Sequence, residues 1–217
     1  MNTSPLSYFV TAFTTLFIIV DPPGNMPVFL AVTEKLDEEL REEVSKKSTI
    51  IGMFLLIVFG FFGKFLLRIF GITLNGLRIA GGILLFSLAL DILHGNVIKE
   101  RRLKKGIRHA EADALAVFPM ALPIYTGPGA ITAAIILNSE ANIFIDYILL
   151  LLAIIIVYAL VRLTHIYSEK ILKVLGKTGS EVIARLMAIF LAAISIELIF
   201  AGIVGKVKAS YQLVYKK

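Results

Sequence analysis

The stretch Asp21-Pro22-Pro23-Gly24-Asn25 interrupts a long apolar run near its middle, and Thr126-Gly127-Pro128-Gly129 interrupts another about half a chain later. Proline lacks a backbone donor and glycine loosens the chain, so a Pro-Gly pair breaks a helix. Inside a bilayer such a break is tolerated only where it is buried in protein or lines a wet cavity. Two breaks at matching positions of the two halves indicate the binding site of a transporter.

The composition around these breaks is that of a membrane protein. Of 217 residues, 58% are hydrophobic and 18% are charged, against a usual charged share of about 25%. Six apolar stretches are long enough to cross a bilayer, at approximately 5–32, 48–70, 72–94, 114–138, 143–163 and 181–204. The sequence therefore predicts an all-α, polytopic protein with six transmembrane helices, of which the first and the fourth are discontinuous.

The basic residues cluster beside the spans, so the net charge of +6 does not indicate a nucleic-acid partner. Fourteen Lys and Arg flank the spans on one side and six on the other. The positive-inside rule then predicts a cell-membrane protein with both termini outside the cytoplasm. The three His, at 94, 109 and 165, lie at or near predicted loop ends and are expected to be solvated. The sequence leaves homo-oligomer formation open.

The chain also carries an internal repeat. Pro23-Gly24 and Pro128-Gly129 are 105 residues apart, and the same offset, give or take two residues, relates 77–82 to 184–189 and Asp91 to Glu197. We therefore predict one transmembrane domain, 1–217, built from two three-helix repeats at 1–95 and 113–217. Because three is an odd number, the second repeat enters from the opposite face, so the repeats are inverted.

The breaks offer helix ends that can bind both charges of a zwitterion. Asp21 and nearby carbonyls suit an ammonium group or a cation, whereas free amides near Asn25 and Ala130 suit a carboxylate. An ionisable residue at membrane depth is a functional candidate by default, although Asp21 could instead only cap the following half-helix. The predicted substrate site comprises Asp21, Gly24, Asn25, Thr126, Gly127, Gly129 and Ala130. Asp21 and Thr126 are also the candidate ligands of a coupling ion. No cofactor is expected beyond a sodium ion or a proton, and Cys-based metal sites are excluded because the chain has no Cys.

Two acid–base pairs near the ends of the third and sixth spans are candidate gates. In an inverted arrangement, Arg78 and Glu197 lie near the outer face, while Asp91 and Arg185 lie near the inner face. Each pair could form a cross-helix ion pair that opens alternately, or the side chains could simply snorkel at helix ends.

Two neighbouring features have structural interpretations. The i,i+4 pairs within residues 34–47 predict a surface helix that continues into the second span, and Gly81-Gly82 predicts a tight helix contact.

Three segments carry a resemblance to a known family. Residues 19–29 (IVDPPGNMPVF), 77–86 (LRIAGGILLF) and 123–132 (PIYTGPGAIT) resemble the first-, third- and fourth-span signatures of the MarC family. Pro23 stands where the pattern usually has an apolar residue, which makes the first break stiffer. The resemblance implies a six-span inner-membrane protein, and similarity to the SnatA-type branch implies uptake of small neutral amino acids, notably glycine and alanine, driven by a sodium or proton gradient.

We therefore predict a secondary transporter that works by alternating access around a central site. An enzyme is not expected, because the chain lacks G-x-S-x-G, H-E-x-x-H and G-x-G-D patterns. An exporter of drugs or other small molecules is the second hypothesis, suggested by the family name, and the small glycine-lined site and the absence of Trp argue against it. A non-transporting scaffold would leave the paired breaks unexplained.

Overall fold

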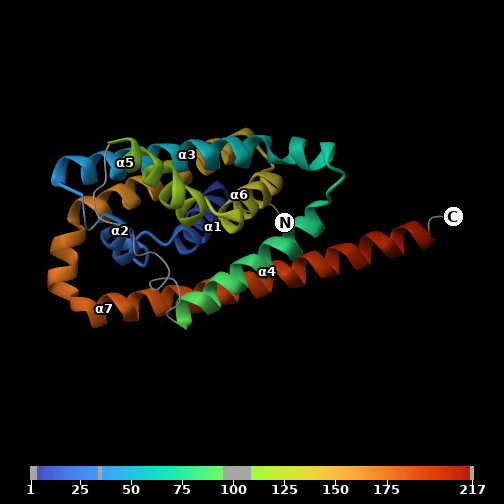
Figure 1. Ribbon diagram of the computed structural model, residues 1–217. Helices are drawn as coiled ribbons and strands as arrows, with labels where there is room; N and C mark the ends of the chain where they lie inside the picture. The colour runs from blue at the N-terminus through green and yellow to red at the C-terminus, as the bar shows by residue number, and fades with distance from the viewer. Residues whose placement is uncertain (1–3, 34–35, 95–108, 216–217) are drawn as a thin grey trace.

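The computed structural model describes residues 4–33, 36–94 and 109–215, and the regular structure in these ranges is entirely helical (Figure 1). The elements are α1 (Pro5–Val20), α2 (Met26–Thr33), α3 (Glu38–Ile69), α4 (Leu74–Leu93), α5 (His109–Leu115), η1 (Ala116–Tyr125), α6 (Pro128–Glu140) and α7 (Phe144–Tyr215). Within these ranges, four helical segments are long and apolar enough to cross a membrane: Glu38–Ile69, Leu74–Leu93, Phe144–Ile171 and Glu181–Tyr211. The predicted all-helical membrane protein is confirmed, and the spans at 5–32 and 114–138, which were predicted to be discontinuous, are divided into shorter pieces.

The helix is interrupted at both predicted positions. α1 ends at Asp21, whose backbone adopts the left-handed conformation (φ 48°, ψ 64°) while its N–H still donates to Phe17 O. Only Asp and Asn among non-glycine residues adopt this conformation readily, because a short polar side chain can bond locally. The second interruption lies at Thr126 and Gly127, after which Pro128 occupies the first turn of α6. Proline suits that position because its missing N–H would have no helical partner there.

The segment before the second break, η1, is less regular than its apolar sequence predicts. Phe118 (φ −130°, ψ 119°) and Leu122 (φ −126°, ψ 131°) are extended within it. Each directly precedes a proline, and the proline ring disfavours the helical conformation for the preceding residue. Pro119 and Pro123 were therefore the sequence signal for this irregularity, which the apolar run concealed.

The long helices α3 and α7 extend beyond their predicted spans. α3 begins ten residues before the predicted second span, with Asp37 as its N-cap, so the expected surface helix does continue into the span. α7 contains both remaining predicted spans and bends at Gly176 (φ 66°, ψ 173°). Gly71, between α3 and α4, has a nearly identical positive φ of 65° and lies 105 residues earlier. Glycine permits both turns because it lacks a Cβ.

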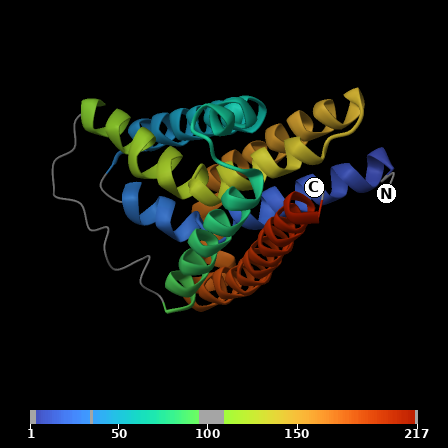
Figure 2. The same ribbon diagram turned by 90° about the vertical axis from the view of Figure 1, so that its right-hand side faces the viewer.

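α4 packs antiparallel to the last part of α7 at the lower edge of the molecule (Figure 2). The approach is close because glycines lie at the crossing: a Cβ on Gly82 would lie 2.7 Å from Ser195 O, and one on Gly202 would lie 2.8 Å from Asn75 O. Small residues at helix crossings are typical of membrane proteins. The predicted contact at Gly82 is confirmed, and Gly81 packs instead against the side chain of Thr132 in α6.

The short helix α6 is buried from Thr132 to Asn138, between α3 on one side and α1 and α4 on the other. Large apolar side chains are exposed on the outer helices instead, among them Phe54, Phe62, Phe65 and Phe200. In a protein with membrane-spanning helices, such a surface contacts the lipid bilayer. α7 ends at the far right of Figure 1, whereas α1 begins near the middle of that view.

Candidate functional site

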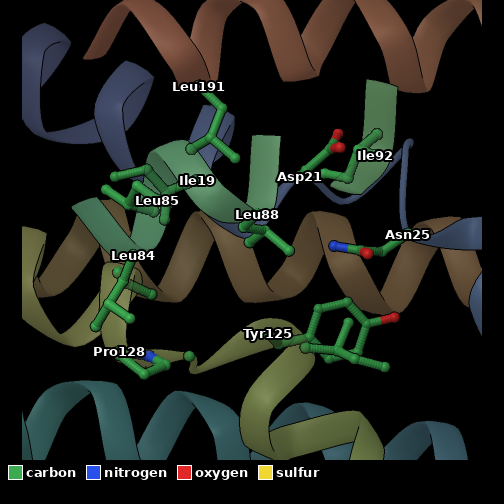
Figure 3. A pocket seen from close by; sticks show the side chains of 14 residues that line it. Ile19, Asp21, Asn25, Leu84, Leu85, Leu88, Ile92, Tyr125, Pro128 and Leu191 are labelled. Atoms are coloured by element: carbon green, nitrogen blue, oxygen red, sulfur yellow. The ribbon is translucent and has the colours of Figure 1, made fainter. Parts of the chain in front are cut away.

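A cavity of about 190 Å³ lies where the two helix breaks approach each other (Figure 3). One part of its wall comes from the breaks and the other from apolar side chains of neighbouring helices. The residues that line it are Ile19, Asp21, Asn25, Leu84, Leu85, Leu88, Ile92, Ile124, Tyr125, Gly127, Pro128, Gly129, Ala130 and Leu191. Five of the seven predicted substrate-site residues are thus brought together, from segments about a hundred positions apart in the chain.

The first break places a buried carboxylate at the cavity. Asp21 is 5% exposed, and its Oδ1 accepts a hydrogen bond from Gly24 N at 3.0 Å. The backbone carbonyl of Asp21 accepts from Asn25 N at 3.0 Å, and the Asn25 side chain donates to Val20 O at 2.8 Å. Asp21 therefore caps the turn and also lines the cavity. The predicted free amides near Asn25 are not found, because these contacts already satisfy them.

The second break presents the opposite polarity. α6 begins at Pro128, and Gly127 provides no side-chain cap for its first turn. Gly129 and Ala130, both in this turn, line the cavity, and a helix N-terminus carries a partial positive charge. Gly129 also contacts Leu85 of α4 so closely that a side chain there would displace it. The cavity therefore lies between an acidic side chain and the positive end of a helix.

An apolar wall, which sequence reasoning missed, completes the cavity. Leu84, Leu88 and Ile92 of α4 line it together with Leu191 of α7. The three α4 residues are four positions apart, so they share one helix face. This periodicity was visible in the sequence, but it could not be distinguished from a face turned to lipid. The site is therefore not lined by small residues alone.

Thr126 does not face the cavity. Its Oγ1 lies 2.9 Å from Gly52 O and 2.6 Å from the hydroxyl of Tyr158, and the residue is fully buried. These contacts fix the second break to α3 and α7. The predicted roles of Thr126 as a substrate or coupling-ion ligand are not supported by this geometry. Gly24 likewise only bonds to Asp21 and does not line the cavity.

The ion pairs near the membrane faces differ from the predicted gates. The Arg78 guanidinium donates to Glu140, at the end of α6, at 2.7 Å rather than to Glu197. In the ranges that the structure describes, no ion pair joins Asp91 to Arg185, and both side chains are exposed. The predicted pairs are therefore not formed in this conformation: Arg78 is paired with Glu140, and Asp91, Arg185 and Glu197 are exposed.

His165 is buried, contrary to the expectation of a solvated histidine. It is 4% exposed, and its ring stacks on Phe29 with the ring centroids 3.8 Å apart. The predicted span ended at 163, but α7 continues, so His165 lies on its buried face with Tyr158, Val161 and Ser168. Their spacing of three and four residues was the sequence signal. His94 is exposed as expected, and the side chain of His109 lies outside the described residues.

The sequence is similar to a known family of membrane proteins and to several of its members. The model of the MarC family integral membrane proteins matches residues 6–207. A UPF0056 membrane protein of Archaeoglobus fulgidus is 48% identical over 201 residues, covering 93% of this chain and 94% of that protein. The UPF0056 membrane protein YvbG of Bacillus subtilis is 34% identical over 202 residues, covering 92% and 95%, respectively. No solved structure matches the chain.

Proposed function

Because this chain belongs to the MarC family of integral membrane proteins, we propose that it is a secondary active transporter of small neutral amino acids such as glycine and alanine. Transport is coupled to a sodium or proton gradient. The observation that carries the proposal is that two broken helices line one cavity with opposite polarity. Broken helices of this kind commonly form the central sites of transporters.

The polarity of the cavity matches a zwitterion. The Asp21 carboxylate is suited to the substrate ammonium group, and the first turn of α6, at Gly129 and Ala130, is suited to its carboxylate. Leu84, Leu88 and Leu191 would surround an uncharged side chain. A cationic or anionic side chain would lose its hydration against this wall without a partner. These features favour neutral amino acids.

The size of the cavity argues against the drug-exporter hypothesis. Pockets for drug-sized ligands usually measure about 300–1,000 Å³, whereas this cavity measures about 190 Å³. A small amino acid fits such a volume better than a bulky aromatic drug does. In this proposal the residues that line the cavity bind the substrate, and none of them is assigned a catalytic role.

The order of elements supports two inverted repeats and alternating access. A broken helix is followed by a long helix and then a third helix in each half, as α1/α2, α3 and α4 and again as η1/α6 and the two arms of α7. Gly71 and Gly176 make the corresponding turns with matching positive φ. The third and sixth predicted helices pack against each other, as α4 and the end of α7. The basic flanks then favour a cell-membrane protein with both termini outside the cytoplasm.

Uptake into proteoliposomes tests the proposal. The purified full-length protein is expected to accumulate labelled glycine and alanine under an inward sodium or proton gradient. Asp21→Asn should weaken alanine binding at least about 30-fold, because losing one partner of a buried charge pair costs about 2–5 kcal/mol. Asp113→Asn, which alters an exposed ion pair with Lys47, is the matched control and should behave like the native protein. Absence of gradient-driven uptake of any neutral amino acid would refute the proposal.

A further inference from the structure

A chain of hydrogen-bonded side chains extends from the wall of the central cavity. The Tyr125 hydroxyl lies 2.5 Å from His165 Nε2, and His165 Nδ1 lies 2.9 Å from Ser45 Oγ. Ser45 Oγ also accepts from Arg162 at 2.5 Å, and the Arg162 guanidinium is paired with Glu42. The chain thus joins η1, α7 and α3 through side chains that can each exchange or hold a proton.

The two ends of this chain lie at different cavities. Tyr125 lines the central cavity together with Asp21 and Asn25, and the Asn25 side chain lies between the other two in the view of Figure 3. His165 and Ser45 line a second cavity of about 870 Å³, between the start of α3 and the middle of α7. The chain therefore crosses the layer of protein that separates the two cavities.

This layer is closed to an amino acid. The Phe29 ring lies flat against the imidazole of His165, at 3.8 Å between centroids and 9° between planes. Tyr125 and His165 are also in ring contact at 5.4 Å. Packing of this density leaves no room for a solute. A proton can still cross such a layer, because it moves by transfer along hydrogen bonds.

The chain can adopt two proton arrangements. In the first, Tyr125 O–H donates to His165 Nε2, and Nδ1–H donates to Ser45 Oγ. In the second, Ser45 O–H donates to Nδ1, and Nε2–H donates to the Tyr125 oxygen. Both arrangements keep a neutral imidazole and leave Arg162 as a donor to Ser45, so the two differ in the tautomer of His165 and in the directions of the Tyr125 and Ser45 hydroxyl protons.

We propose that Tyr125, His165 and Ser45 form a proton path between the central cavity and the second cavity, so that the coupling ion is a proton. The proposal rests on the proposed transport function. As a proton reaches the Tyr125 oxygen, the phenolic proton moves to Nε2, the Nδ1 proton moves to Ser45 Oγ, and the Ser45 proton leaves toward the Glu42 carboxylate. One proton enters and one leaves, and the chain passes from its first arrangement to its second. Asp21, on the same cavity as Tyr125, is the carboxyl group that gives up the proton.

Acidic side chains offset the basic side chains around the path, which favours proton transfer. Glu42 lies three residues before Ser45 on α3, so both are on one helix face. It offsets the positive charge of Arg162, which would otherwise repel a proton at His165. At the second cavity, Arg41 is paired with Glu169, and Glu38, Glu39 and Lys170 also line the wall. On the central side, Asp21 is the acidic group lining the cavity.

Removal of one hydroxyl tests the path in proteoliposomes. Tyr125→Phe keeps the ring and the wall but breaks the chain, and should slow proton-driven alanine accumulation on the order of a hundredfold, as for a positioned proton-transfer group. Alanine counterflow by His165→Gln, whose side chain lies outside the central cavity, should persist, because exchange requires no net proton movement. Tyr8→Phe is the matched control: its buried hydroxyl bonds Leu137 O at 2.9 Å, away from the chain, and driven accumulation should persist.

The other outcomes separate the path from the transport function. His165→Gln, which can donate and accept but cannot change tautomer, should reproduce the effect of Tyr125→Phe. Native-level proton-driven accumulation by either variant would overturn the path. Accumulation by the native protein under a sodium gradient alone would overturn it too, while leaving the proposed transporter intact.

A spectroscopic measurement needs no transport at all. In protein labelled with ¹⁵N-histidine in lipid, His165 can be assigned among the three His by its absence in His165→Gln. The path predicts exchange between two neutral tautomers in the native protein and one fixed tautomer in Tyr125→Phe. A single fixed tautomer in the native protein at every pH at which it stays folded would overturn the path, whatever the transported solute.

Discussion

Thr126→Val tests whether the second break is held in place by the Thr126 hydroxyl. Oγ1 donates its one proton to Gly52 O at 2.9 Å, so the Tyr158 hydroxyl is the donor in the 2.6 Å contact with Oγ1. Valine keeps the shape of the side chain but removes both bonds. Gly52 O retains the hydrogen bond of its own helix α3, whereas Tyr158, which is fully buried, loses its acceptor.

The magnitude follows from these two losses. A hydrogen bond contributes about 1 kcal/mol net, and a buried polar group left without a partner costs a further 1–3 kcal/mol or so, which gives a destabilisation of about 2–4 kcal/mol for Thr126→Val. Tyr158→Phe should cost only about 1 kcal/mol, because Thr126 still donates to Gly52. In the double variant no donor is left unpaired. The losses of unfolding free energy in the two single variants, added together, should therefore exceed the loss in the double variant by at least about 1 kcal/mol.

The assay is reversible unfolding in detergent micelles, followed by circular dichroism because the chain has no Trp. Thr164→Val is the control: its hydroxyl bonds only to Val161 O within the same helix, and a shift within about 0.5 kcal/mol is expected. Strict additivity of the double variant would refute the reasoning. A Thr126→Val protein of native stability with weakened alanine binding would instead restore the original prediction that this hydroxyl contacts the ligand.

Three further predictions concern packing and selectivity. Gly82→Val should destabilise the protein by about 1–3 kcal/mol in the same assay, because the new Cβ would strike the backbone of α7. Gly60→Ala should cost less, because its new Cβ would come no closer than 3.3 Å to its nearest neighbour, Ala134 Cβ. Gly176→Ala has free space around it, so its cost should be the roughly 1–3 kcal/mol of a backbone conformation (φ 66°, ψ 173°) that is essentially restricted to glycine. Leu88→Ala removes part of the apolar wall and so enlarges the cavity. In competition assays, the affinity for valine relative to alanine should rise by about tenfold or more.

The sequence predicted the two breaks and their common cavity, but not which way each group would face. Proline and glycine act through the local backbone, so Pro23-Gly24 and Pro128-Gly129 could be interpreted without knowledge of any neighbour. The direction of the Thr126 hydroxyl depends on Gly52 and Tyr158, which are 74 and 32 residues away in the chain. His165 was misplaced for the same reason, since its partners Ser45 and Tyr125 come from other helices.

The acid–base pairs likewise separate what the sequence predicts from what only the packing of distant helices decides. The sequence left two interpretations of Arg78 open, an ion pair across to another helix or snorkelling at the helix end. Its partner, Glu140, ends α6 and is 62 residues away, and the repeat offset pointed instead to Glu197. The repeat relates residues that are equivalent, and equivalence between halves does not specify contact.

The sequence by itself determined the membrane class, the helical content and the two breaks, because hydrophobicity, proline and glycine act over a few residues. Tertiary structure alone decided which side chains complete the cavity and which chain of groups leads away from it. α4 contributes the apolar wall, and the wall between the cavities comes from η1, α7 and α2. The physical reason is that a hydrogen bond or a packing contact is set by geometry to within a fraction of an ångström, and that geometry arises only when distant helices pack together.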